Sequence, residues 1–346
     1  MPDSKTMKYG EAIRGALIHA MERDPKVFVM GIGVDDHRAV FGSTLGLVDR
    51  FGRERVFDTP IAEGAMTGIA IGAALNGFKP VHIHIRTDFL YLAMDQLCNI
   101  AAKWRAMFGG EMSVPLVVRA VIGRSWGQGA QHSQSLQSFF MHVPGFRVAM
   151  PTTPAEAQGL LLSALAGRDP AILIEHRLLY DISGEVPNPP RAFPFGKAVV
   201  RREGRDVTII ANSYMAVESL KAAEYLAGHG IEIEVVDPVS LVPLDRATLL
   251  GSIRKTGRLL VVDTSWISCG VSAEIAALAA DEAFDALTGP VRRLGMKPVA
   301  CPVSKPLENE FYPSARTIAA EVFAMLGRAA PQGRAPELAN DFKGPF

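Results

Sequence analysis

Residues 62–85 read AEGAMTGIAIGAALNGFKPVHIHI, in which a helical stretch of small residues (62–76) is followed by a short strand pattern (80–85). The same alternation recurs on both sides. Short β-branched runs and helical patterns that alternate imply parallel strands joined by crossover helices. The sequence therefore predicts an α/β domain with a doubly wound sheet. Strands are expected at 27–33, 80–85, 114–122, 146–150 and 170–175, with helices at 8–23, 62–76, 90–107, 133–141 and 154–166.

The proline-rich stretch EVPNPPRAFPFG (185–196) is expected to continue neither a helix nor a strand, and we interpret it as a linker. After it the alternation restarts and predicts a smaller doubly wound domain. The expected organisation is a domain at 1–184, the linker, a domain at 197–330 and a polar tail at 331–346. In the second domain, strands are expected at 206–211, 231–237, 258–263 and 290–295, with helices at 214–228, 244–254, 271–286 and 315–327.

The composition excludes several classes of partner. The chain has 346 residues, with 36 Lys and Arg against 36 Asp and Glu, so its formal net charge is zero. Neither nucleic acid nor an anionic membrane surface is then an expected partner. No signal-peptide pattern or membrane-length apolar run is found, and we expect a cytoplasmic protein. Cys98, Cys269 and Cys301 are too far apart for a zinc site or a disulfide framework, so we expect each to be a small core side chain.

The helix at 62–76 carries Gly64, Gly68 and Gly72. Each glycine costs about 0.5–1 kcal/mol relative to alanine in a helix interior, so the three need a compensating reason. Close approach of another backbone or of a ligand is the obvious one. Glu63 is in the first turn, where the helix dipole favours a carboxylate; a charge that merely complements the helix end is the commoner explanation.

Two histidines lie where open α/β sheets bind ligands, at the carboxyl ends of strands. His84 lies at the carboxyl end of the expected strand 80–85, and His132 is in the glycine-rich loop GQGAQHSQSL (127–136). His82 and His84 should face the same side of the sheet, but no third ligand at suitable spacing suggests a metal. A histidine that only braces its loop is the alternative for His132.

Residues 123–127, GRSWG, match the G-x-S-x-G pattern of serine hydrolases. That pattern must lead directly into a helix, whereas here a flexible loop continues. His176 and His229, the histidines that could complete a triad, lie in places that suggest structural roles. A hydrolase is therefore disfavoured.

Several stretches together resemble the beta subunit of the thiamine-diphosphate-dependent decarboxylating component of 2-oxo acid dehydrogenases, in the transketolase superfamily. The resemblance covers about residues 8–326, and its A-Q-H-S-Q and D-T-P-I-x-E segments are highly specific. It is carried by DTPIAEGAMTGIAIGAALNGFKPV, FLYLAMDQLCNIAAKWRAMFGG, GQGAQHSQSLQSFFMHVPGFRVAMPTTPAEAQGLL, PAILIEHRLLY and EIEVVDPVSLVPLDRATLLGSIRKTGRLLVVD.

The resemblance implies a pyrimidine-binding domain followed by a transketolase C-terminal domain. It also implies site residues. Glu63 would hydrogen-bond the aminopyrimidine of thiamine diphosphate, Phe89 would stack on that ring, and Ile61 would contact the cofactor. His132 would act on the substrate as a general acid or an electrostatic partner.

Relatives hold the diphosphate through a divalent metal bound to a G-D-G segment, and this sequence contains no Gly-Asp dipeptide. No metal ligand is therefore expected in this chain. The resemblance implies an alpha subunit that carries Mg²⁺ and the diphosphate half of the site. It also implies a heterotetramer in which beta chains contact each other, and a lipoyl acyltransferase as a further partner.

Some residues depart from the family pattern. HIHIRTDF places His84 and Arg86 near the cofactor pocket and GRSWGQG adds Arg124; together with Gln131 we assign them to the substrate pocket. Extra charge would suit a more polar or anionic substrate than pyruvate. A split transketolase-like or acyloin-forming carboligase subunit is the alternative function, and a non-catalytic assembly subunit is another.

Overall fold

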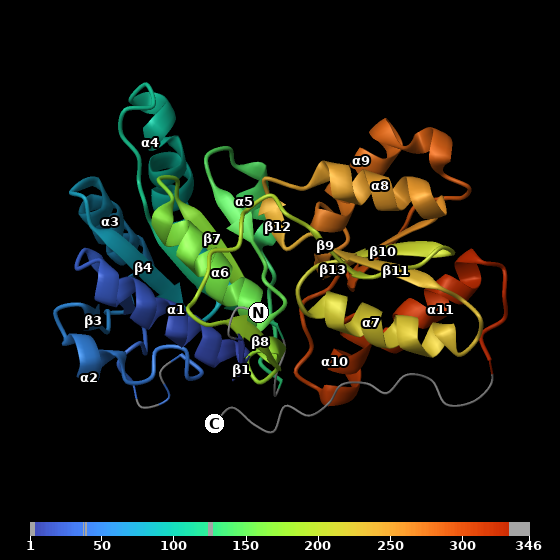
Figure 1. Ribbon diagram of the computed structural model, residues 1–346, viewed down its shortest axis with the longest axis horizontal. Coiled ribbons are helices and arrows are strands. Elements are labelled where there is room, and N and C mark those ends of the chain that lie inside the picture. Colours follow the sequence, from blue (N-terminus) through green and yellow to red (C-terminus); the bar gives the residue numbers. More distant parts are fainter. Residues whose placement is uncertain (1–3, 37, 39, 124–126, 332–346) are drawn as a thin grey trace.

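The computed structural model describes residues 4–36, 38, 40–123 and 127–331, and it has two α/β lobes side by side (Figure 1). The larger lobe is built on a seven-stranded sheet of order β12-β6-β7-β5-β4-β2-β3, in which only β12 is antiparallel to its neighbour. The predicted parallel sheet is confirmed. Its strands are β2 (Val27–Gly31), β3 (Val56–Phe57), β4 (Lys79–His84), β5 (Val117–Ile122), β6 (Arg147–Ala149), β7 (Ala171–His176) and β12 (Ser240–Val242).

Helices cover both faces of this sheet because its strands are apolar on both sides. Every residue of β5 and β7 is buried. One face packs on α1 (Tyr9–Arg23) and α6 (Pro154–Ala166). The other face packs on α3 (Glu63–Leu75), η1 (Thr87–Ala93), η2 (Asp95–Ala101), α4 (Ala102–Met107) and α5 (Gln137–His142).

The smaller lobe has a five-stranded sheet of order β14-β13-β10-β11-β9, with only β9 antiparallel. In Figure 1, α7 and α11 lie below this sheet and α8 and α9 above it. The second doubly wound unit is therefore confirmed. Its elements are β9 (Val199–Arg202), β10 (Val207–Ala211), β11 (Ile233–Asp237), β13 (Leu259–Trp266), β14 (Arg292–Met296), α7 (Tyr214–Ala227), α8 (Arg246–Thr256), α9 (Val271–Glu282), η4 (Phe284–Ala286), α10 (Lys305–Phe311) and α11 (Ala315–Met325).

The structure differs from the sequence-based expectations in several places. The helix expected at 90–107 is a 3₁₀ turn, a π-helical stretch and a short α-helix in succession. The helix expected at 133–141 begins only at Gln137. The stretch 185–196 begins within β8 (Ser183–Pro187), which pairs with β1 (Ser4–Lys8), so its first residues do continue a strand. The short helix α2 (Leu47–Phe51) was not expected.

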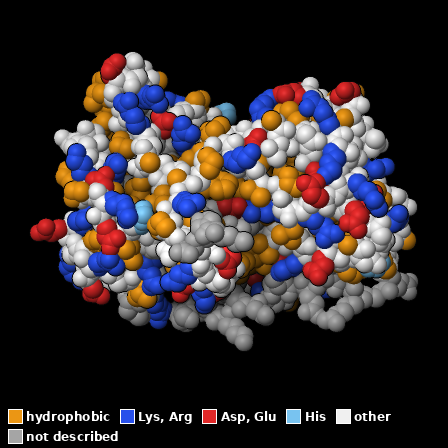
Figure 2. Space-filling view, viewed as in Figure 1, with side chains coloured by type: hydrophobic (Ala, Val, Ile, Leu, Met, Phe, Trp, Pro, Cys, Tyr) orange, Lys and Arg blue, Asp and Glu red, His pale blue; other side chains and the backbone are white. Residues whose placement is uncertain are grey.

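The cysteines were also expected to be core side chains, and this is wrong for one of them. Cys301 is buried and Cys98 is half-buried, whereas Cys269 is exposed. Within the described residues, no helix is both long and apolar enough to cross a membrane. On the face shown in Figure 2, basic and acidic side chains are interspersed over both lobes.

Candidate functional site

The candidate site lies at the carboxyl edge of the larger sheet, where the parallel strands β2, β4, β5 and β7 all end. The loops that follow them hold polar side chains far apart in the sequence. Open α/β sheets bind their ligands at this edge. Phe41 follows β2, Arg86 and Phe89 follow β4, His132 follows β5, and Arg177 follows β7.

Glu63 is the first residue of α3, and its side chain is buried with 6% of its surface exposed. Its carboxylate takes part in none of the side-chain hydrogen bonds or ion pairs found among the described residues. Burial of a carboxylate is unfavourable unless it is hydrogen-bonded or paired. The helix dipole compensates only part of that cost, so the position suits a hydrogen-bonding ligand from outside the chain.

The three glycines of α3 have different surroundings. A Cβ at Gly64 would lie 2.9 Å from the Leu92 carbonyl oxygen, so this glycine is needed for α3 to touch η1. A Cβ at Gly72 would meet nothing within 4 Å. Ile69, on the same helix, is 57% exposed. At Gly64 the close approach inferred from the sequence is therefore made by the chain itself, whereas at Gly72 no described residue lies within 4 Å of the Cβ position.

Phe89 and His132 are brought together. Their ring centroids lie 5.3 Å apart in an edge-to-face arrangement. The loops that carry them are tied by two hydrogen bonds: the Thr87 hydroxyl donates to the Gln134 carbonyl (3.0 Å), and the Gln134 backbone N–H donates to the Asp88 carboxylate (3.2 Å). The aromatic ring and the imidazole thus share one rigid corner of the site.

The smaller lobe closes the site from the other side. The Tyr312 hydroxyl donates to the backbone carbonyl of Ser133, next to His132 (3.4 Å). The Gln137 side chain donates to Asp263 (2.9 Å) and to Thr264 (3.0 Å) in β13. The loop that carries His132 is therefore held between both lobes.

His82 and His84 face the same side of β4, as predicted, with ring centroids 4.2 Å apart. Burial lowers the pKa of His82 to about 4. Burial, and then the neighbouring His82, lower the pKa of His84 well below its usual value. Both rings are neutral at physiological pH, and among the described residues no group of three or more His, Cys, Asp or Glu could hold a metal ion.

The other residues expected at the site differ in exposure. Arg86 is buried, whereas Gln131 is exposed and Ile61 is 82% exposed. Exposure leaves Ile61 open to a partner or a ligand. Arg124 lies outside the described residues. The sequence did not indicate that Phe41 and Arg177 belong to the site. The loops after β2 and β7, which carry them, meet at Arg86 only in the folded chain, and no local motif shows this.

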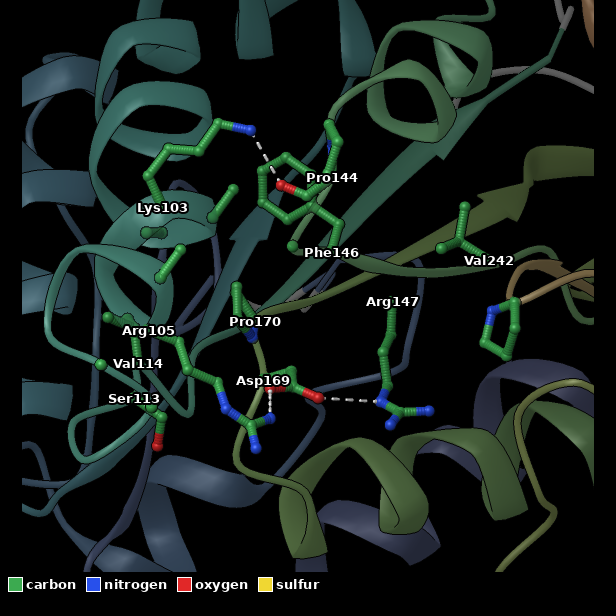
Figure 3. A pocket seen from close by; sticks show the side chains of 17 residues that line it. Lys103, Arg105, Ser113, Val114, Pro144, Phe146, Arg147, Asp169, Pro170 and Val242 are labelled. Atoms are coloured by element: carbon green, nitrogen blue, oxygen red, sulfur yellow. Dashed lines mark hydrogen bonds and ion pairs between the residues drawn. The ribbon is translucent and has the colours of Figure 1, made fainter.

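One cavity lies away from this corner and another adjoins it. One of about 820 Å³, shown in Figure 3, is lined by residues that precede β5, β6 and β7, so it opens at the amino edge of the sheet. Asp169 binds both Arg105 and Arg147 (2.7 and 3.4 Å), and Lys103 in the same lining donates to the carbonyl of Pro144 (2.9 Å). The second, of about 960 Å³, lies between the lobes beside Gln134 and Trp266.

Comparison with known proteins identifies the fold and the family. The transketolase pyrimidine-binding domain matches residues 5–182, and the transketolase C-terminal domain matches residues 196–318. The chain belongs to the transketolase family. Membership of this family implies dependence on thiamine diphosphate.

Curated relatives of this transketolase-family chain are beta subunits. The acetoin:2,6-dichlorophenolindophenol oxidoreductase subunit beta of Bacillus subtilis (strain 168) is 38% identical over 339 residues, covering 94% of this chain and 99% of that protein. The mitochondrial pyruvate dehydrogenase E1 component subunit beta-2 of Oryza sativa subsp. japonica is 41% identical over 332 residues, covering 95% and 88%. A solved structure of a split-gene transketolase, an inactive beta4 tetramer, superposes with a TM-score of 0.75 at 24% identity, covering 92% of this chain and 98% of that one. The last comparison shows the fold alone.

The residues present fit the family's cofactor. A buried carboxylate with no partner in the described chain suits hydrogen bonding to a heterocycle. Phe89 is 36% exposed and so keeps ring surface available for stacking.

Proposed function

We propose that the chain is the beta subunit of a thiamine-diphosphate-dependent 2-oxo acid decarboxylating and acyl-transferring enzyme. The observation that carries the proposal is the edge-to-face contact of Phe89 with His132 beside the end of α3 that bears the buried Glu63. The named relatives favour this function over the carboligase alternative.

Each residue has a role that its surroundings support. Glu63, buried and without a partner among the described residues, would hydrogen-bond a ring nitrogen of the cofactor's aminopyrimidine. Phe89 would stack on that ring, and Ile61 would contact the cofactor from the turn before α3. His132 is exposed and held by both lobes, so its imidazole would donate a proton to, or accept one from, the reacting substrate. When bound, thiamine diphosphate supplies the electron sink that decarboxylation needs.

The proposal includes an alpha subunit that binds Mg²⁺ and the diphosphate. The lack of a Gly-Asp dipeptide in the sequence supports this division. A lipoyl acyltransferase is the acyl acceptor in the proposal, and contacts between beta chains complete the heterotetramer. A cytoplasmic location stays a prediction, and the rice relative is named mitochondrial.

Co-purification with an alpha chain that contains G-D-G tests the proposal. The complex, supplied with thiamine diphosphate and Mg²⁺, should reduce an artificial electron acceptor when given a 2-oxo acid. His132→Gln should lower kcat at least a hundredfold and leave the apparent affinity for the cofactor within threefold. His142→Gln, an exposed histidine at the end of α5, is the matched control. A complex that oxidises no 2-oxo acid, but uses a ketose as donor, would contradict the proposal.

A further inference from the structure

Every second residue from the end of β4 into η1 buries a polar atom that has no hydrogen-bond partner among the described residues. These residues are His84, which ends β4, Arg86 in the connection, and Asp88 in η1. The atoms are Nε2 of His84, Nε of Arg86 and Oδ2 of Asp88. The three side chains are only 5%, 3% and 7% exposed. More than nine in ten buried polar groups in proteins are hydrogen-bonded, so three unpartnered atoms this close together are unusual, and of the three side chains only Arg86 carries a permanent charge.

The guanidinium of Arg86 is oriented for a ligand from outside the described chain. Its Nη1 donates to the carbonyl of Ile85 (3.0 Å). The edge of the guanidinium group that carries Nε makes no hydrogen bond through Nε to any described residue. That edge is one of those through which arginine binds a carboxylate with two parallel hydrogen bonds. Arg86 is in none of the ion pairs of the described residues, and an unpaired buried charge is strongly unfavourable.

Two arginines lie against the ring of Phe41 beside this strand end. The guanidinium carbons of Arg86 and Arg177 lie 5.6 and 4.1 Å from the centre of the Phe41 ring. Burial, and then Arg177, lower the pKa of Arg86 to about 10, so the group stays cationic at neutral pH. Asp88 is the nearby acid on the same segment, but one of its oxygens is bound by the Gln134 backbone and burial raises its pKa. Arg86 is therefore cationic at the place where an anion would bind.

This anion site is next to the reacting centre. The backbone N–H of Phe89 donates to the carbonyl of Arg86 (3.3 Å), so one turn of η1 separates them. The Phe89 ring in turn touches His132.

We propose that Arg86 binds a second acidic group on the substrate, and that the enzyme acts on a 2-oxo acid with a terminal carboxylate. The proposal rests on the function proposed above. The carboxylate that is lost as CO₂ lies at the His132 end, and the terminal carboxylate is held by Arg86. Arg86 is thus a residue that determines specificity.

The test compares substrates of matched length in the assembled alpha–beta complex. We expect kcat/KM for 2-oxoglutarate to exceed that for 2-oxopentanoate at least tenfold. Arg86→Met should lower kcat/KM for 2-oxoglutarate about ten- to a hundredfold and change that for 2-oxopentanoate less than threefold. Arg86→Lys should restore part of the preference, and Arg246→Met, an exposed arginine on α8, should leave it unchanged.

A binding experiment separates failure of this inference from failure of the proposed function. Calorimetry measures the binding of glutarate and of butyrate to the complex without turnover. Glutarate should bind at least tenfold more tightly than butyrate, and Arg86→Met should abolish this preference. Inorganic phosphate as a third ligand tells a general anion site from a carboxylate site, and tighter binding of phosphate than of glutarate would overturn the dicarboxylate assignment. Equal binding of glutarate and butyrate would overturn the inference. So would loss of the alpha–beta complex in Arg86→Met, because the partner's own acid would then occupy the site.

Discussion

At the scale of single residues, Glu63 carries the strongest chemical argument, because its side chain is only 6% exposed and its carboxylate has no hydrogen-bond or ion-pair partner among the described residues. Glu63→Gln keeps the shape and removes the charge. We expect the variant to assemble with its partner and to lose at least a hundredfold in kcat. Glu274→Gln, an exposed first-turn glutamate of α9, is the matched control in the same assay. Near-normal turnover in Glu63→Gln would remove this residue from the mechanism.

His82 predicts a dependence of stability on pH. Its pKa is about 4 in the folded chain and near 6.5 when unfolded, so below pH 6.5 the unfolded state binds the proton more readily. Stability is therefore lost as the pH falls from 7 towards 4. Between pH 7 and 5 the free energy of unfolding should fall by about 2 kcal/mol more in the wild type than in His82→Gln. Denaturant titrations at the two values measure this, with exposed His229→Gln as the control. An equal fall in wild type and His82→Gln would contradict it.

At the scale of elements, a buried ion pair joins β5 to β7 below the site. Arg119 contacts both carboxylate oxygens of Glu175 (2.6 and 2.8 Å) and also donates to the Ser43 hydroxyl (3.0 Å), and the Tyr180 hydroxyl donates to Glu175. The pair thereby anchors the loops that follow β2 and β7, from which Phe41 and Arg177 reach Arg86.

Arg119→Met leaves a buried, unpaired carboxylate, so we expect the free energy of unfolding to fall by about 3–5 kcal/mol. The double variant Arg119→Met/Glu175→Met should recover part of this loss. Arg105→Met, which breaks a half-exposed pair with Asp169, should cost at most about 1 kcal/mol. Chemical denaturation measures all three, and equal effects of Arg119→Met and Arg105→Met would refute the anchoring role.

In helix α3, one substitution is expected to stabilise the isolated chain but to weaken its assembly with a partner. Gly72 has open space around its Cβ position, so Gly72→Leu should raise the free energy of unfolding of the isolated chain by about 0.5–1 kcal/mol. If a partner packs on this face, the same change should weaken assembly at least tenfold by size-exclusion titration. Gly251→Leu on α8, which has equally open surroundings, should stabilise the chain without affecting assembly. Unchanged assembly in Gly72→Leu would show that no partner contacts this position.

Elements with a clear apolar period could be predicted from the sequence, because burial on both faces produces continuous β-branched runs such as β5 and β7. The stretch 90–107 could not, since a 3₁₀ turn and a π-helix share helical composition. β12 was missed because its pairing with β6 joins residues about ninety positions apart. In the candidate site, Glu63, Phe89 and His132 could be proposed from the sequence because each lies in a short segment that resembles the family. Phe41 and Arg177 depend on loops that meet only in the folded chain.

At the scale of the whole molecule, the proposed function requires a second subunit, because this chain would bind only the aminopyrimidine side of the cofactor. The carboxyl edge of the larger sheet presents Glu63, Phe89, Arg86 and His132. The face of α3 that bears Ile69 and Gly72 is open. Both features fit a second subunit that completes the pocket.

Calorimetric titration of thiamine diphosphate with Mg²⁺ into the isolated chain, and then into its complex with the alpha subunit, tests this claim most directly. We expect at least hundredfold weaker binding by the isolated chain, and tight binding together with turnover of a 2-oxo acid once the partner is present. Tight binding and full turnover by the isolated chain would contradict the account.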